Sequence, residues 1–116
     1  MLPKNQRLRL SQDLTATVRS GVRSGRRNVV LYARRQADPV SGDRIGFIVS
    51  KAVGVAVKRN LAKRRLRAIA RELRSDEGNL DIVVRALPGA AELSWDELRR
   101  QVASGWSAIE HKLVDR

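Results

Sequence analysis

The sequence contains no cysteine, only one histidine, and few aromatic residues: two Trp, one Tyr and one Phe. Without cysteine the chain can form no disulfide, zinc ribbon or thiol nucleophile. The single histidine, His111, cannot form a metal site alone, and Asp96 and Glu97 are explained by capping of a helix. We therefore expect no catalytic residue and no metal-binding residue in this chain.

Long apolar runs are also missing. No stretch approaches the roughly 20 apolar residues that a membrane-spanning helix needs, and the opening MLPKNQRLRL lacks the apolar core of a signal peptide. We expect a cytoplasmic protein with no membrane partner and no obligate protein partner. The length of 116 residues predicts one domain, residues 1–116, large enough to bury a core.

Acidic residues are scarce where basic residues are dense. The chain carries 24 Lys and Arg against 12 Asp and Glu, a net charge of +12, and residues 1–75 hold 19 of the former but only 4 of the latter. The electrostatic field of this excess positive charge attracts polyanions. Arginine outnumbers lysine, and its planar guanidinium group suits phosphate oxygens and the faces of bases.

The charge is densest in residues 51–74, KAVGVAVKRNLAKRRLRAIARELR, which predict a glycine-bearing loop followed by a helix. Residues 58–74 contain eight cations and one carboxylate, that of Glu72. A helical wheel collects the apolar residues on one side and most cations on the other. The apolar residues are Ala62, Leu66, Ile69, Ala70 and Leu73. A solvated charged surface is the alternative, but the near absence of carboxylates favours phosphate as the partner.

The remaining pattern predicts an α+β fold, a small sheet covered by helices. A short helix begins at Ser11 and ends at Gly21, and residues 21–28 form a loop. Strands are expected at 29–34, 44–50 and 80–86, the first two paired as a hairpin through a turn at 38–43. Ser94 to Glu97 form a capping box that opens a last helix.

Several motifs in this order resemble the protein subunit of bacterial ribonuclease P. The matching segments are 46–51 (GFIVSK), 53–54 (VG), 56–60 (AVKRN) and 63–67 (KRRLR), with flanking similarity at 2–5 (LPKN) and 86–89 (ALPG). The resemblance implies the ribonuclease P protein fold, which is shared with a ribosomal-protein domain. Its element order is α-β-β-(β)-α-β-α, and it contains an unusual left-handed βαβ crossover.

The resemblance also implies a function. The family protein binds a catalytic RNA, and the complex is an endoribonuclease that removes the 5′ leader of precursor tRNA. The RNA subunit carries the active site and holds the Mg²⁺ ions, so the partners are ribonuclease P RNA and precursor tRNA. A structural RNA-binding protein, such as a small ribosomal protein, is the alternative that composition alone leaves open.

Two groups of site residues follow from the resemblance. The group that binds the RNA subunit is Lys51, Gly54, Lys58, Arg59, Asn60, Lys63, Arg64, Arg65, Arg67 and Arg71. The group at the leader-binding cleft is Leu14, Val18, Tyr32, Phe47 and Ser50. The family usually has aromatic residues at the positions of Leu14 and Val18, so packing in the core is an equal interpretation for these two.

Overall fold

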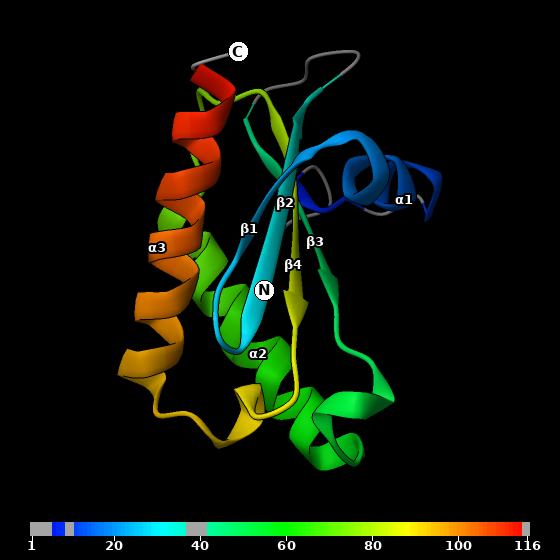
Figure 1. The fold of residues 1–116 in the computed structure, drawn as a ribbon, viewed down its shortest axis with the longest axis vertical. Helices are drawn as coiled ribbons and strands as arrows, with labels where there is room; N and C mark the ends of the chain where they lie inside the picture. Colours follow the sequence, from blue (N-terminus) through cyan, green and yellow to red (C-terminus); the bar gives the residue numbers. More distant parts are fainter. Residues whose placement is uncertain (1–5, 9–10, 37–41, 115–116) are drawn as a thin grey trace.

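A computed structural model describes residues 6–8, 11–36 and 42–114 (Figure 1). The helices are α1 (Ser11–Ser20), α2 (Ala56–Leu73) and α3 (Trp95–Val114), and the strands are β1 (Val22–Gly25), β2 (Val29–Arg35), β3 (Arg44–Ile48) and β4 (Leu80–Ala86). Two 3-10 turns, η2 (Lys51–Val53) and η3 (Ala90–Glu92), precede α2 and α3. This α-β-β-β-α-β-α order confirms the predicted fold class.

The four strands form one mixed sheet in the order β1-β2-β4-β3. β2 pairs antiparallel with both β1 and β4, whereas β3 pairs with β4 in parallel. The predicted hairpin between β2 and β3 is therefore wrong, because β4 lies between them. The turn residues 38–41 of that prediction lie outside the described residues.

β1 was predicted as a loop and is a strand. Its four residues, VRSG, are too short to give a pattern in the sequence, but they pair in register with Gly25 opposite Val30 and Val22 opposite Ala33. Val22 and Ser24 are buried while Arg23 and Gly25 are exposed. β1 is thus one edge of the sheet, with one side against the core and one side open.

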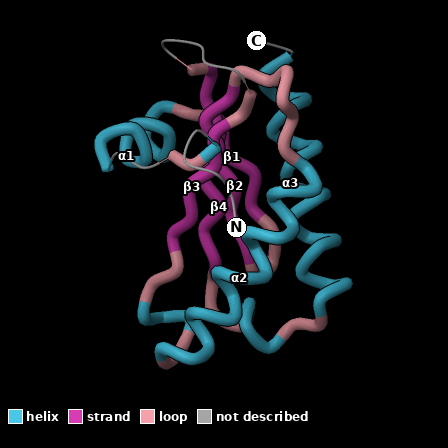
Figure 2. Tube along the Cα trace, turned by 180° about the vertical axis from the view of Figure 1, so that it is seen from behind, coloured by secondary structure: helices cyan, strands magenta, loops and turns pink. Residues whose placement is uncertain are grey.

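The crossover from β3 through α2 to β4 is left-handed, as the resemblance implied. β3 and β4 are neighbouring parallel strands, and in Figure 1 both point downward with β3 to the right of β4 while α2 passes behind the sheet. Figure 2, drawn from behind, shows α2 in front of the strands. This is the rare hand for such a connection, and it places α2 and α3 on the same side of the sheet.

Alternation along the strands divides the core into two layers. Toward α2 and α3, the main cluster includes Leu31, Ile82 and Ile109, all fully buried. Toward α1, a smaller cluster contains Leu8, Val30, Tyr32 and Val83, with Leu14 and Val18 of α1 packed against it. The sheet therefore has one fully covered face and one face that α1 covers only in part (Figure 1).

The two long helices were predicted correctly in kind and nearly in extent. In α2 the residues Ala62, Leu66, Ile69 and Ala70 are buried, as the helical wheel required. This helix ends at Leu73. In α3 the Ser94 hydroxyl accepts a hydrogen bond from the Glu97 backbone N–H at 3.1 Å, which confirms the predicted N-cap.

Candidate RNA interface

The outer side of α2 presents the cations that the sequence analysis singled out. Asn60, Arg64, Arg67 and Arg71 are exposed, and Lys63 is half-buried. Within the described part of the chain, neither Lys63 nor Arg67 forms an ion pair. Lys63, Arg67 and Arg71 are spaced four residues apart, so they form one row along the helix.

Other predicted RNA-binding residues already have partners in the protein. The Lys58 ammonium lies 2.8 Å from a carboxylate oxygen of Glu92 in η3, and its hydrogen bond holds the pKa of Glu92 below the usual range. Arg65 donates a hydrogen bond at 2.7 Å to the Leu93 carbonyl. Arg59 is half-buried, and its Nε has no partner within the described residues. Lys58 and Arg65 therefore also connect α2 to the segment that precedes α3.

The segment between β3 and α2 turns sharply. The Ser50 hydroxyl caps η2 by accepting a hydrogen bond from the Ala52 N–H at 3.4 Å, and Lys51 is exposed. Gly54 follows with φ of 146°, a conformation that favours glycine. A side chain at this position would also meet Lys58, whose Cδ would lie 2.9 Å from the added Cβ. Gly54 thus allows the chain to turn directly into the first residues of α2.

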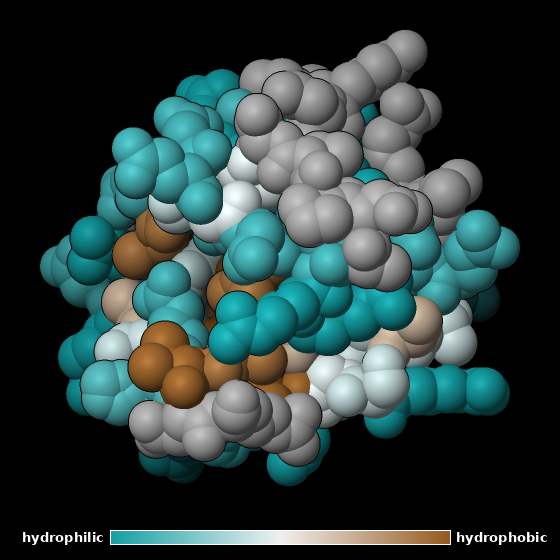
Figure 3. Space-filling view, turned by 90° about the horizontal axis from the view of Figure 1, so that it is seen from above, coloured by the Kyte–Doolittle hydropathy of each residue, from teal (hydrophilic) through white to brown (hydrophobic). Residues whose placement is uncertain are grey.

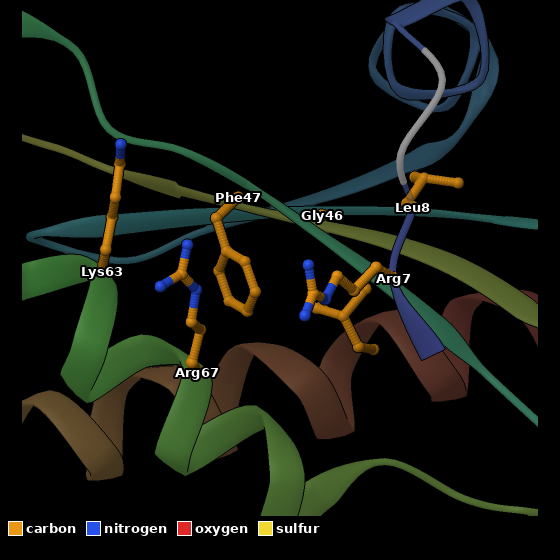
Figure 4. Close-up of a pocket in the computed structure, with 7 residues that line it drawn as sticks. Arg7, Leu8, Gly46, Phe47, Lys63 and Arg67 are labelled. Atoms are coloured by element: carbon orange, nitrogen blue, oxygen red, sulfur yellow. The ribbon is translucent and has the colours of Figure 1, made fainter. Parts of the chain in front are cut away.

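A recessed pocket lies where α2 faces the outer edge of β3 (Figure 4). It has a volume of about 190 Å³ and is lined by Arg7, Leu8, Ile45, Gly46, Phe47, Lys63 and Arg67. A second hollow of about 200 Å³ is lined by Arg64, Arg67, Ala68 and Arg71. Arg67 lines both, so the two hollows are adjacent along α2. Figure 3 looks down on the molecule from the top of Figure 1, along the strands, and shows mainly hydrophilic side chains around a smaller hydrophobic area among the residues it colours.

On the opposite face, the structure brings together three of the five residues predicted for the leader cleft. Leu14 and Val18 of α1 pack against the cluster that contains Tyr32. Gly46 makes this approach possible, since a Cβ added there would lie 3.1 Å from Leu14 Cδ1. Leu14 and Val18 are partly buried in this cluster, and both flank the open part of the sheet.

Phe47 and Ser50 do not join this group. Phe47 packs against the cluster on the α2 side, because neighbouring residues of a strand point to opposite faces and Ile48 belongs to the α1 side. The placement of Phe47 in the α1 cleft is therefore wrong. Ser50 is exposed beyond the end of β3, where it caps η2.

Two cations on the α1 side were not predicted as site residues from the sequence. Arg23 lies opposite Tyr32, and Arg85 lies opposite Val30. Directly paired residues share a face, so both arginines, which are exposed, border the cluster containing Tyr32. The sequence offered one indication of such a cation. Arg85 is a charged residue inside the largely apolar segment LDIVVRA, two residues from the buried Val83 and so on the same strand face.

The buried carboxylates already have polar partners within the protein. Asp81 is fully buried and accepts two hydrogen bonds from Arg44, at 2.9 and 3.1 Å. Asp43 is also buried, and its carboxylate accepts from the backbone N–H groups of Ser75 and Leu80 at 3.1 Å each. These donors occupy the oxygens that a hard cation would need, so these two carboxylates do not fit a magnesium site. His111 is exposed on α3.

Two further features are absent from the described ranges. Among residues 6–8, 11–36 and 42–114, no three His, Cys, Asp or Glu side chains gather as metal ligands would. No helix in those ranges is both long enough and apolar enough to span a bilayer.

Known proteins resemble this chain over nearly its whole length. A protein from Pseudarthrobacter chlorophenolicus named ribonuclease P protein component is 54% identical over 119 residues, covering 100% of this chain and 85% of the relative. A protein of the same name from an Arthrobacter species is 61% identical over 100 residues, covering 84% and 72% of the two chains.

Solved structures agree in fold. The structure of a Staphylococcus aureus RNase P protein mutant with defective mRNA degradation activity superposes with a TM-score of 0.84 at 24% identity, covering 92% of this chain and 90% of that one. The RNase P protein from Thermotoga maritima gives a TM-score of 0.71, also at 24% identity, covering 84% and 92%. The family profile described as Ribonuclease P matches residues 2–110. The chain therefore belongs to the ribonuclease P protein family.

Proposed function

We propose that this chain binds ribonuclease P RNA through the basic side of α2 and holds the 5′ leader of precursor tRNA on the open face of the sheet beside α1. Membership of the family makes it part of the ribonucleoprotein enzyme that matures the 5′ ends of tRNA. The site residues, the leader contact and the location of the metal ions are the proposed elements.

The observation that carries the proposal is the row of cations on α2. Lys63 and Arg67 have no carboxylate partner in the described ranges, although the opposite side of the same helix is fully packed. A neighbouring pair of unneutralised cations, such as Lys63 and Arg67, is maintained at an electrostatic cost unless a polyanion covers it. RNA phosphates would neutralise it, and Lys51, beside the sharp turn at Gly54, would extend the contact.

The open side of the sheet suits a single strand better than a duplex. Tyr32 contributes an aromatic residue that is mostly buried, 8% exposed, and Arg23 and Arg85 lie on adjacent rungs of the same face. Leu14 and Val18 form the wall contributed by α1. This combination of an aromatic residue with flanking cations is typical of sites that bind single-stranded nucleic acid. Aliphatic side chains at positions 14 and 18 stack less well, so the leader contact here depends more on the two arginines.

The chemistry is assigned to the RNA subunit. The buried carboxylates Asp43 and Asp81 are occupied by backbone N–H groups and by arginine, so we place the Mg²⁺ ions on the RNA. The contribution of the protein is then to neutralise phosphates, to orient the leader and to raise the affinity of the RNA for its metal ions.

Reconstitution tests the proposal. The purified chain is added to ribonuclease P RNA at low Mg²⁺, and cleavage of precursor tRNA is followed. We expect strong stimulation over RNA alone, with loss of stimulation when Lys63 and Arg67 are both changed to Gln. The matched control is the double variant R27Q/R100Q, which removes two exposed cations away from α2, one between β1 and β2 and one on α3. An absence of stimulation by the wild-type chain would refute the proposal.

A further inference from the structure

The pocket between β3 and α2 combines three cations with an aromatic ring. Arg7, Lys63 and Arg67 line it together with Phe47, and no carboxylate is among its lining residues. Figure 4 shows the Phe47 side chain between the side chains of Arg67 and Arg7, with Lys63 farther along α2. Phe47 is only half-buried, so part of its ring is available to a ligand in the pocket.

The backbone of β3 adds hydrogen-bonding groups at the same place. The segment containing Arg7 and Leu8 lies along the beginning of this edge strand, where Leu8 N–H donates to the Ile45 carbonyl at 2.9 Å. Backbone groups of alternate residues point to the same side of a strand, so the N–H and C=O of Phe47 also point outward. No described residue pairs with Phe47 at this edge. Within the described residues, the pocket thus borders one backbone donor and one backbone acceptor that have no partner.

We propose that this pocket holds one unstacked nucleotide of the ribonuclease P RNA. The phosphate lies among Arg7, Lys63 and Arg67, and the base packs against Phe47 with its edge toward the outward-facing backbone N–H and C=O of Phe47. This inference rests on the proposed function, because it assumes that the basic side of α2 binds that RNA. It adds that the contact includes a base as well as phosphates.

Three features favour an unpaired nucleotide. A base inside an RNA duplex has its faces stacked and its pairing edge occupied, so it could not enter a recess and contact Phe47. A free phosphate would leave the ring and the backbone edge without a partner. Arg67 also lines the neighbouring hollow with Arg64 and Arg71, so the strand on either side of the inserted nucleotide would continue along α2.

The test compares two substitutions in the full-length chain bound to ribonuclease P RNA, without tRNA. Phe47→Leu keeps an apolar side chain for packing but removes the ring, and Lys63→Gln removes a charge. For Phe47→Leu we expect RNA affinity to fall about fivefold or more, with the salt dependence unchanged. For Lys63→Gln we expect the slope of log affinity against log salt to become shallower by about 0.7. Ile48→Leu, on the other face of β3, is the control and should bind as the parent does.

Chemical probing of the RNA bases gives the direct readout. The wild-type chain should protect one unpaired base that becomes reactive again with Phe47→Leu, while protection of neighbouring backbone positions persists. Thermal unfolding of Phe47→Leu must match the parent, so that the loss is not one of folding. If the wild-type chain binds the RNA but Phe47→Leu changes neither affinity nor base reactivity, the nucleotide pocket is refuted and the proposed function stands. If the wild-type chain fails to bind the RNA, both are refuted.

Discussion

Arg44 on β3 donates two hydrogen bonds to the carboxylate of Asp81 on β4, one from Nε at 2.9 Å and one from a terminal nitrogen at 3.1 Å. Asp81 is fully buried, whereas the Arg44 side chain is about a quarter exposed (26%). Arg34 on β2 approaches the same carboxylate at 3.5 Å and also reaches Asp13 of α1 at 3.4 Å. One buried carboxylate thus connects three strands and, through Arg34, the helix that flanks the open face.

Asp81→Asn should destabilise the fold strongly. Removal of one partner of a buried pair leaves uncompensated charge, at a typical cost of about 3–5 kcal/mol. Because both arginines retain some contact with solvent, we expect the free energy of unfolding to fall by about 3 kcal/mol, the lower end of that range. Urea unfolding followed by circular dichroism measures the change in the free energy of unfolding.

A double-variant cycle separates this interaction from a simple loss of packing. Arg44→Met keeps the apolar stem and removes the charge. The combined variant Asp81→Asn/Arg44→Met should lose clearly less stability than the sum of the two single losses. Each single variant leaves one charge without its partner, whereas the combined variant removes both charges. Strictly additive losses would show that the pair is not coupled.

Glu92→Gln should strengthen binding to ribonuclease P RNA. It releases Lys58, whose ammonium is now 2.8 Å from the Glu92 carboxylate, and it removes a negative charge beside the start of α2. An exposed ion pair of this kind is weak, so we expect only a modest gain, up to about fivefold in affinity at low salt. Equilibrium binding at several salt concentrations measures it.

The matched control is Glu97→Gln. That change releases Arg100 on α3 from its contact with Glu97 at 2.5 Å, at a site separate from the basic side of α2. RNA affinity should stay at the parent value. Equal gains from both variants would mean that only the net charge matters and that Lys58 has no specific place in the interface.

The helices of this fold could be predicted because their signals are local. The apolar spacing of α2 and the Ser94 cap of α3 lie within a few residues of the structure they specify. Strand pairing is different. β2 and β3 are close in sequence, yet their common neighbour is β4, which follows only after the whole of α2. Nothing within either strand distinguishes this arrangement from a hairpin.

The candidate site shows the same division. The cations of α2 follow directly from the helical wheel, but the predicted position of Phe47 depended on which way β3 faces. Because side chains alternate, a shift of one residue moves Phe47 from the Tyr32 side to the α2 side. Arg23 was not predicted as a site residue because β1 itself was not expected. Arg7 lines the pocket only because its segment lies along β3, a long-range pairing that the sequence does not indicate.

Glu110→Gln should stabilise the protein at neutral pH. Partial desolvation of this exposed residue, with a further contribution from the charge of Asp43, raises the pKa of Glu110 above its usual value of 4.5, although His111 partly offsets the effect. The folded state therefore holds this proton more tightly than the unfolded state, and stability is lost as the pH rises from 4.5 through the folded pKa. Thermal midpoints should be higher for the variant at pH 7 and equal to the parent at pH 3. An equal shift at both pH values would contradict a titration effect.

Leu14→Phe should increase the preference of the holoenzyme for precursor tRNA over mature tRNA. Leu14 is half-buried beside the open face, and its Cδ1 already lies close to Gly46, so the larger ring must extend toward the open side. Stacking on an aromatic residue is worth roughly 1–3 kcal/mol per base, and we expect at least about a fivefold gain in the ratio of the two affinities. Binding of 5′-leader-bearing and mature tRNA to the reconstituted enzyme measures that ratio.

Thr15→Phe provides the comparison, because it adds the same ring at the neighbouring, exposed position of α1. Successive helical residues point about 100° apart, so this ring should leave the affinity ratio unchanged. If Leu14→Phe instead lowers the thermal midpoint and leaves the ratio at the parent value, Leu14 acts only in packing α1 against the sheet. In that case the leader must be held mainly by the charges of Arg23 and Arg85, and Arg85→Gln should then reduce the ratio while leaving affinity for mature tRNA intact.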